Sequence, residues 1–201
     1  MTPANDRPAV LNIEGDLIAL GPVRRDLVPT YQRWVNDFGT ARTLALPPGP
    51  TTEEAEQDWF DRVARQGPSD RSFTIYDRET WRPVGTTGLH QIDHRHRTAS
   101  FGLMIGEPDA RGRGFGTEAT RLILDYGFVA LGLNNVMLTV YEFNLAARRA
   151  YEKAGYKEIG RRRACRWMGG RAWDEIYMDC VADEFESPVL AAILVPDEPR
   201  P

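Results

Sequence analysis

The chain has 201 residues, of which 42% are hydrophobic and 27% charged, and its formal net charge is -4 at pH 7. This length and balance are those of one compact globular domain, and they exclude both a peptide-like scaffold and a largely disordered chain. The acidic charge disfavours sequence-independent nucleic-acid binding, which draws most of its affinity from a basic surface.

The sequence contains no apolar run of roughly 18 to 20 residues that could span a bilayer, and its first ten residues lack the pattern of a secretory signal. We therefore expect a cytoplasmic protein that binds neither membranes nor nucleic acid. Cys165 and Cys180 are too few for a disulfide framework and have no metal-ligand spacing, so we interpret them as buried thiols.

The first half of the chain has the pattern of a strand and two helices followed by a meander. Apolar spacing predicts a strand over residues 16–20 and a helix over 22–38. After the breaker Pro47–Pro50, Thr52 is the expected N-cap of a second helix that ends near residue 65. Three antiparallel strands are then predicted over residues 72–76, 84–92 and 98–105.

The second half begins with the strongest helical pattern, from Thr117 to about residue 133. A buried strand is predicted over 136–140, and Asn144 stands at the N-cap position of a helix that ends at Gly155. Two last strands, 157–167 and 172–182, are joined at a Gly-Gly dipeptide typical of a tight hairpin. The pattern indicates an α+β domain with one mixed, mostly antiparallel sheet.

The polar composition of both ends sets the expected limits of the domain. We assign residues 1–14 to a flexible N-terminal extension, 15–183 to the domain and 184–201 to a C-terminal tail. The tail contains the apolar run Leu190–Val195, for which an added strand, a contact between subunits and a segment packed on its own domain are alternatives. A homodimer is therefore a candidate assembly.

The segment between the third meander strand and the strongest helix has the pattern of a phosphate-binding loop. Its glycines at 112, 114 and 116 allow successive backbone N–H groups to face one point, and the helix N-terminus adds a positive field. No Gly-Lys-Ser/Thr follows, which excludes a Walker loop, and the glycine spacing fits a dinucleotide-binding turn badly. A plain glycine-rich turn is the remaining alternative.

Two motifs resemble one known family. Arg111-x-x-Gly114-x-Gly116 resembles the Q/R-x-x-G-x-G/A signature of the GCN5-related N-acetyltransferases (GNAT), and Asn144-LAARRA-Tyr151-EKA-Gly155 is similar to a later segment of that family. The resemblance covers about residues 15–183 and implies a sheet of about seven strands flanked by about four helices. The run IGEPDARGRGFGTEA looks like the branch that contains the RimJ and RimL acetyltransferases and spermidine acetyltransferase.

The resemblance implies an N-acetyltransferase that transfers an acetyl group from acetyl-CoA directly to a primary amine. Tyr151 is implied to donate a proton to the departing thiolate, and its spacing of seven residues from Asn144 puts both side chains on one helix face. A core tyrosine and a purely capping asparagine are the alternatives. The residues implied to hold the cofactor are Met104, Ile105, Arg111, Gly112, Arg113, Gly114, Gly116, Thr117 and Asn144.

The general base is the point at which the sequence departs from this branch of the family. Ser100 stands where many members have Glu, and a serine hydroxyl is too weak a base to replace a carboxylate. Ser100 could hold a water, Glu142, His90 or Asp93 could act instead, or the amine could enter neutral. We take Tyr151, Ser100 and Glu142 as the candidate catalytic set.

Two charged clusters allow other interpretations. His90, His94 and His96 could bind zinc, but their place in a polar turn favours solvated side chains, and we expect no metal site. The run Arg161–Arg163 with Arg166 could contact the CoA 3′-phosphate, RNA or a ribosomal partner, although an exposed strand explains it equally well.

The sequence leaves the acceptor open between a protein N-terminus and a small amine such as a polyamine, an antibiotic or an amino-acid derivative. The acidic run of Glu53, Glu54, Glu56 and Asp58 could attract a cation, but such a run is also ordinary on an exposed helix. A non-catalytic acyl-CoA sensor and an RNA-binding accessory protein are the competing functions.

Overall fold

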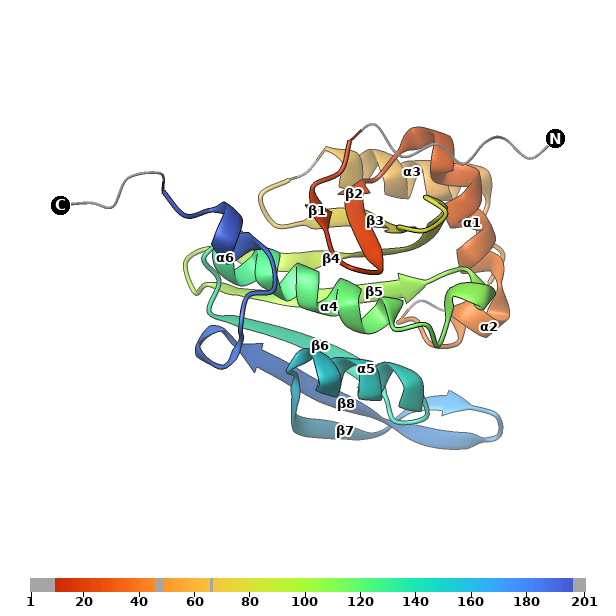
Figure 1. The fold of residues 1–201 in the computed structure, drawn as a ribbon. Coiled ribbons are helices and arrows are strands. Elements are labelled where there is room, and N and C mark those ends of the chain that lie inside the picture. Colours follow the sequence, from red (N-terminus) through yellow and green to blue (C-terminus); the bar gives the residue numbers. More distant parts are fainter. Residues whose placement is uncertain (1–9, 46–48, 66, 197–201) are drawn as a thin grey trace.

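The computed structural model describes residues 10–45, 49–65 and 67–196, which form one mixed sheet with helices on both faces (Figure 1). The strands, in the spatial order β1-β2-β3-β4-β5-β6-β8-β7, are β1 Ile13–Glu14, β2 Ile18–Pro22, β3 Arg71–Asp77, β4 Pro83–Asp93, β5 Thr98–Ile105, β6 Asn135–Tyr141, β7 Lys157–Met168 and β8 Arg171–Val181. The helices are α1 Val28–Asn36, α2 Phe38–Ala41, α3 Glu53–Ala64, α4 Phe115–Asp125, α5 Leu145–Ala154 and α6 Leu190–Ile193.

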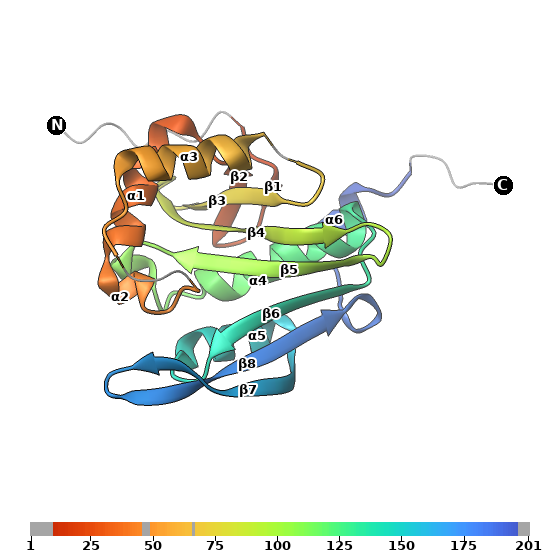
Figure 2. The same ribbon diagram turned by 180° about the vertical axis from the view of Figure 1, so that it is seen from behind.

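The sheet is antiparallel from β1 through β5 and again from β6 through β8 and β7, and its one parallel pair within the described residues is β5 with β6. Helices α4 and α5 lie side by side on one face, and α1 and α3 cover the other face at the N-terminal half (Figures 1 and 2). The predicted α+β fold is therefore confirmed. The expected numbers of strands and helices were too low, because the two-residue strand β1 and the four-residue helices α2 and α6 are too short to have a recognisable sequence pattern.

The main core lies between the sheet and α4. Ala119, Leu122 and Ile123 recur at helical spacing and are buried against apolar side chains of the strands, among them Leu89 and Val136. A smaller cluster of Val28, Tyr31, Trp34 and Phe60 joins α1 to α3. This second cluster matters for function because it holds α3 over the sheet.

Most element boundaries agree with the sequence prediction. Thr52 caps α3 by accepting the Ala55 N–H at 3.2 Å, and Asn144 caps α5 by accepting the Ala147 N–H at 3.3 Å. The strongest helix begins two residues before Thr117 and continues as a π-helical turn over Tyr126–Ala130. Part of the predicted breaker, Pro47 and Pro48, lies outside the described residues.

The helix predicted over 22–38 is divided in the structure. Pro22 ends β2, a 3-10 turn covers Arg25–Leu27, and α1 then ends at Asn36. Asp37 has an extended backbone and accepts the N–H groups of Gly39 and Thr40, so it starts a separate helix, α2. The division turns the chain over the end of β5, where the site lies.

The C-terminal segment lies on its own domain. Asp125, at the end of α4, accepts hydrogen bonds from the Ser187 hydroxyl at 2.5 Å and from the N–H groups of Val189 and Leu190. Leu190 is buried, and the segment forms the short helix α6, so of the three alternatives the structure shows a segment packed on its own domain and not an added strand. Residues 13–14, assigned to the N-terminal extension, pair with β2; residues 1–9 lie outside the description.

The cysteine interpretation holds for one residue only. Cys180 is buried on β8, and burial raises the pKa of its thiol to about 11. Cys165 is half-buried and donates to the Arg162 carbonyl, because β7 bulges away from β8 there. Among the described residues, no helix is both long and apolar enough to cross a membrane.

Candidate active site

The site is organised by the divergence of β5 from β6. The two strands pair only where Thr98–Ser100 faces Asn135–Met137, whereas β5 pairs with β4 up to Ile105. Figure 2 shows β5 and β6 moving apart beyond this point. Alternate residues of β5 after Ser100 therefore direct backbone groups into a gap that is open for an extended ligand to pair with.

The glycine loop closes one end of this gap. Gly112 and Gly114 adopt positive φ values of 77° and 90°, which side-chain-bearing residues rarely reach. As a result, the backbone N–H groups of residues 112–117 donate to no acceptor among the described residues. Gly114 is also the N-cap of α4 and offers no capping side chain. Free N–H groups at a helix N-terminus are a binding site for a phosphate or pyrophosphate.

A groove of about 420 Å³ runs between this loop and α5. Its lining contains nearly all of the residues that the sequence assigned to cofactor binding, namely Met104, Ile105, Arg111, Gly112, Gly114, Gly116, Thr117 and Asn144. Tyr151 lines the same groove, so the structure brings together the two motifs about thirty residues apart. The Arg111 guanidinium donates to Thr40 Oγ1 at 2.6 Å, which ties the loop to α2.

Arg113 does not line the groove. Its side chain turns to the opposite side, where it donates to the buried carboxylate of Asp77 at 3.0 Å and lies over the Phe115 ring. The cofactor role that the sequence assigned to Arg113 was for its backbone N–H, which remains free in the loop. The side chain fixes the loop to the end of β3.

Tyr151 belongs both to the core and to the groove. Its ring packs edge-on against Phe101, with centroids 5.9 Å apart, and only 7% of the residue is exposed. Burial raises the pKa of its phenol to about 12, and no hydrogen-bond partner for the hydroxyl is found among the described residues. The phenol is thus protonated at neutral pH and available as a proton donor to a ligand in the groove.

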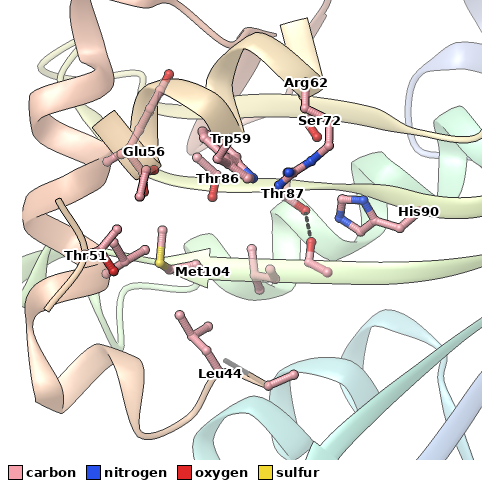
Figure 3. A pocket seen from close by; sticks show the side chains of 16 residues that line it. Leu44, Thr51, Glu56, Trp59, Arg62, Ser72, Thr86, Thr87, His90 and Met104 are labelled. Carbon is pink, nitrogen blue, oxygen red and sulfur yellow. Dashed lines mark hydrogen bonds between the residues drawn. The ribbon is translucent and has the colours of Figure 1, made fainter. Parts of the chain in front are cut away.

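A second cavity, of about 410 Å³, lies beneath α3 on the other side of β5. It shares Leu44, Leu103 and Met104 with the groove, so the two spaces meet at the end of β5. In Figure 3, Trp59 projects from α3 over the cavity and Met104 from β5 lies opposite it. The walls are thus largely apolar and aromatic.

Glu56 is the unexpected member of this cavity. The other three acidic residues of the run from 53 to 58 are not buried, whereas Glu56 is only 6% exposed and lines the cavity. Burial raises the pKa of its carboxyl, and no described residue donates a hydrogen bond or pairs with it. An uncompensated carboxyl in a cavity is costly unless a ligand supplies the partner. The sequence predicted the capped helix that contains Glu56. It did not predict how that helix is rotated about its axis, and this rotation decides that Glu56 faces the cavity.

The structure separates the candidate bases. Ser100 and Glu142 line neither cavity: the Ser100 hydroxyl donates to the Gln91 side chain at 3.2 Å, and Glu142 accepts the Asp174 N–H. Asp93 accepts the His96 N–H in the turn after β4, which lowers the pKa of its carboxyl. His90 alone among the four lines the second cavity.

The remaining clusters are held by local contacts. His94 Nε2 lies 3.0 Å from the Pro68 carbonyl oxygen, and no group of potential metal ligands occurs among the described residues. Arg161 pairs with Glu158 and Asp174 on the exposed strand β7, as an ordinary solvated strand would.

Comparisons with known proteins agree with this geometry. Residues 18–157 match the family model described as an acetyltransferase (GNAT) domain. The chain is 33% identical over 100 residues to the uncharacterized N-acetyltransferase YoaA of Bacillus subtilis, and 38% identical over 77 residues to spermidine N(1)-acetyltransferase of Escherichia coli. These matches cover 50% and 38% of this chain and about half of the relatives' own length, 56% and 41%.

Among solved structures, the fold is similar to that of spermidine N-acetyltransferase from Vibrio cholerae, determined in complex with CoA and spermine. The TM-score is 0.76 at 22% identity, and the match covers 85% of this chain and 98% of the other. At this identity the likeness supports the fold.

Proposed function

The chain belongs to the GNAT acetyltransferase family, and we propose that it transfers an acetyl group from acetyl-CoA to a primary amine of a linear diamine or polyamine. Membership confirms the family predicted from the sequence, which uses acetyl-CoA and includes named N-acetyltransferases among the relatives. The RimJ/RimL branch and the cytoplasmic location stay predictions.

The observation that carries the proposal is the meeting of two cavities at Leu44, Leu103 and Met104. One cavity ends at the phosphate-binding N–H groups, and the other contains the buried carboxyl of Glu56, which no described residue pairs with. A thioester at the meeting point would be reached by an amine from the opposite side, which is the geometry of direct transfer in a ternary complex.

The groove residues fit the cofactor by their chemistry. Free N–H groups of residues 112–117 would hold the pyrophosphate, and the open side of β5 would pair with the amide-rich pantetheine arm. Acetyl-CoA supplies an activated acyl carbonyl. A backbone N–H of β5 near Leu103 would stabilise charge that develops on its oxygen, and Tyr151 would protonate the leaving sulfur.

The acceptor class follows from Glu56 and the apolar walls. A linear diamine places one amino group at the thioester and offers its second ammonium to Glu56, with its methylene chain against Trp59 and Leu44. The relatives named for spermidine acetylation support the same class. Arg62 also lines the cavity, from the exposed side of α3, and disfavours a third positive charge at that position.

The test is the release of CoA thiol from acetyl-CoA with 1,4-diaminobutane, spermidine, an aminoglycoside, alanine, and peptides that start with Ala or Ser. We expect the highest kcat/KM with the diamine or polyamine. Glu56→Gln should raise KM for 1,4-diaminobutane about tenfold or more and leave KM for butylamine within twofold. Turnover with peptides alone would refute the acceptor class, and acetyl-CoA binding with no turnover would favour a sensor.

A further inference from the structure

The second cavity, beneath α3, is the acceptor cavity of the proposed reaction, and it contains few groups that could accept a proton from the amine. Within the described part of the chain, its titratable side chains are Tyr31, Glu56, Arg62 and His90. Tyr31 is hydrogen-bonded to Thr74, and burial raises the pKa of its phenol to about 12. Arg62 carries a guanidinium group, which donates hydrogen bonds and has no acceptor atom. Glu56 and His90 are left.

His90 lies beside the meeting point of the two cavities. A Cβ atom on Gly102 would lie 3.2 Å from His90 Nε2, so this nitrogen sits directly over a residue without a side chain. Gly102 is the neighbour of Leu103, which both cavities share. In Figure 3, Glu56 lies toward the far end of the cavity from His90, next to Thr51.

Asp70 fixes the orientation of the imidazole. Its carboxylate oxygen lies 3.2 Å from His90 Nδ1, and both side chains are about half exposed. A proton on Nδ1 donated to Asp70 leaves the lone pair of Nε2 free above Gly102. The charged groups that face the same cavity are Glu56 and Arg62, both from α3.

The backbone departs from a regular strand directly after His90, whose own pairing with Ser100 is regular. The pairing of β4 with β5 shifts register between His90 and Asp93, and the next residue, Gln91, has a φ of 52°. A bulge redirects side chains. A positive φ is uncommon for a residue other than glycine. The Gln91 side chain is held by Ser100, so the residue that replaces the family's carboxylate supports the bulge next to His90.

We infer that His90 is the general base for the acceptor amine and that Asp70 is its positioning residue, an inference that rests on the function proposed above. His90 Nε2 accepts a proton from the acceptor ammonium and passes it to water at the exposed edge of the ring. The neutral nitrogen then forms a C–N bond with the acyl carbon. The C–S bond breaks, and Tyr151 protonates the sulfur.

The second nitrogen proton leaves through His90, and solvent returns one proton to Tyr151. The balance is one ammonium and one thioester converted into one amide, one thiol and one released proton. No oxidant, reductant or metal is required.

The test compares His90→Gln, Asp70→Asn and the control His94→Gln in thiol release with 1,4-diaminobutane, or with the best acceptor of the panel above. At pH 7 we expect His90→Gln to lower kcat about 100-fold or more and Asp70→Asn about tenfold, with KM for acetyl-CoA unchanged. His94 lines neither cavity, so its variant should match the wild type.

The readout that separates a base from a structural role is pH. Between pH 7 and pH 9.5 the deficit of His90→Gln should shrink at least tenfold, because more of the diamine enters as free base. A deficit that stays constant with pH, or activity of His90→Gln within threefold of the wild type, overturns the inference. A large kcat loss in Glu56→Gln with His90→Gln unaffected assigns the base to Glu56 instead. If the wild type acetylates no amine of the panel, the proposed function itself fails.

Discussion

Replacing Tyr151 with Phe removes one hydroxyl from the groove and little else. The ring keeps its edge-on contact with Phe101 and its contact with the Tyr156 ring, whose centroid is 6.1 Å away. The hydroxyl has no hydrogen-bond partner among the described residues, so its removal leaves no described group unsatisfied. The free energy of unfolding should therefore change by less than about 1 kcal/mol. The affinity for acetyl-CoA should remain within about threefold.

The catalytic effect should be much larger than the structural one. Proton donation by a positioned group contributes about 10²- to 10⁴-fold, and a thiolate needs this help less than an alkoxide does, so we expect a kcat loss near 10²-fold, or about 2.7 kcal/mol. Steady-state thiol release measures kcat, and calorimetry measures acetyl-CoA binding. Because the pKa of the phenol is raised to about 12, its ionisation should cause no fall of wild-type kcat below about pH 10. A kcat within threefold of the wild type in Tyr151→Phe, with binding retained, would refute the assignment.

Three further predictions concern the scaffold of the site. Gly114→Ala places a side chain on a residue with a φ of 90°, and its Cβ would lie 3.2 Å from the Leu17 side chain. Calorimetry should therefore show the affinity for acetyl-CoA reduced about tenfold or more. The control Gly160→Ala, whose Cβ would meet nothing within 4 Å, should leave the affinity unchanged. Asp125→Ala removes three hydrogen bonds to the C-terminal segment and should lower the free energy of unfolding in urea by about 2 to 3 kcal/mol, whereas the exposed Asp183→Ala should change it by less than about 0.5 kcal/mol; equal values would refute the docking role. Burial acts to raise the pKa of Glu107, but hydrogen bonds from Arg33 and Trp34 outweigh it and hold the pKa below its ordinary value. Glu107 therefore stabilises the fold above the pKa of the unfolded chain, near 4.3, and this contribution disappears as pH falls through the folded value; thermal melts of Glu107→Gln should show less loss of stability below about pH 4.5 than melts of the wild type.

The parts of the site that follow from local backbone chemistry were predictable from the sequence. Gly112 and Gly114 are needed for positive φ, and Asn144 and Tyr151 share a helix face by spacing alone. The acceptor cavity was not predictable, because it depends on how α3 rotates on the cluster around Tyr31 and Trp34. That rotation decides that Glu56 turns inward while its acidic neighbours stay in water.

The pairing of His90 with Asp70 shows the same limit. The two residues are twenty positions apart, and they meet because the antiparallel register of β3 with β4, which pairs Arg71 with Leu89, places Asp70 opposite His90. Sequence spacing had grouped His90 with His94 and His96 instead. Strand alternation cannot reveal such a partner, because it does not fix the register of β3 against β4, which includes a shift between Ile75 and Tyr76.

The short pairing of β5 with β6 also has a mechanical consequence. Three residue pairs at one end form a hinge between two half-sheets, and beyond it no backbone hydrogen bond fixes their angle within the described residues. A ligand that forms hydrogen bonds with β5 and packs on α5 contacts both half-sheets and therefore restricts the motion of one relative to the other. Amide exchange in β5 and β6 should therefore slow along the strand length beyond Ser100 when the groove is filled.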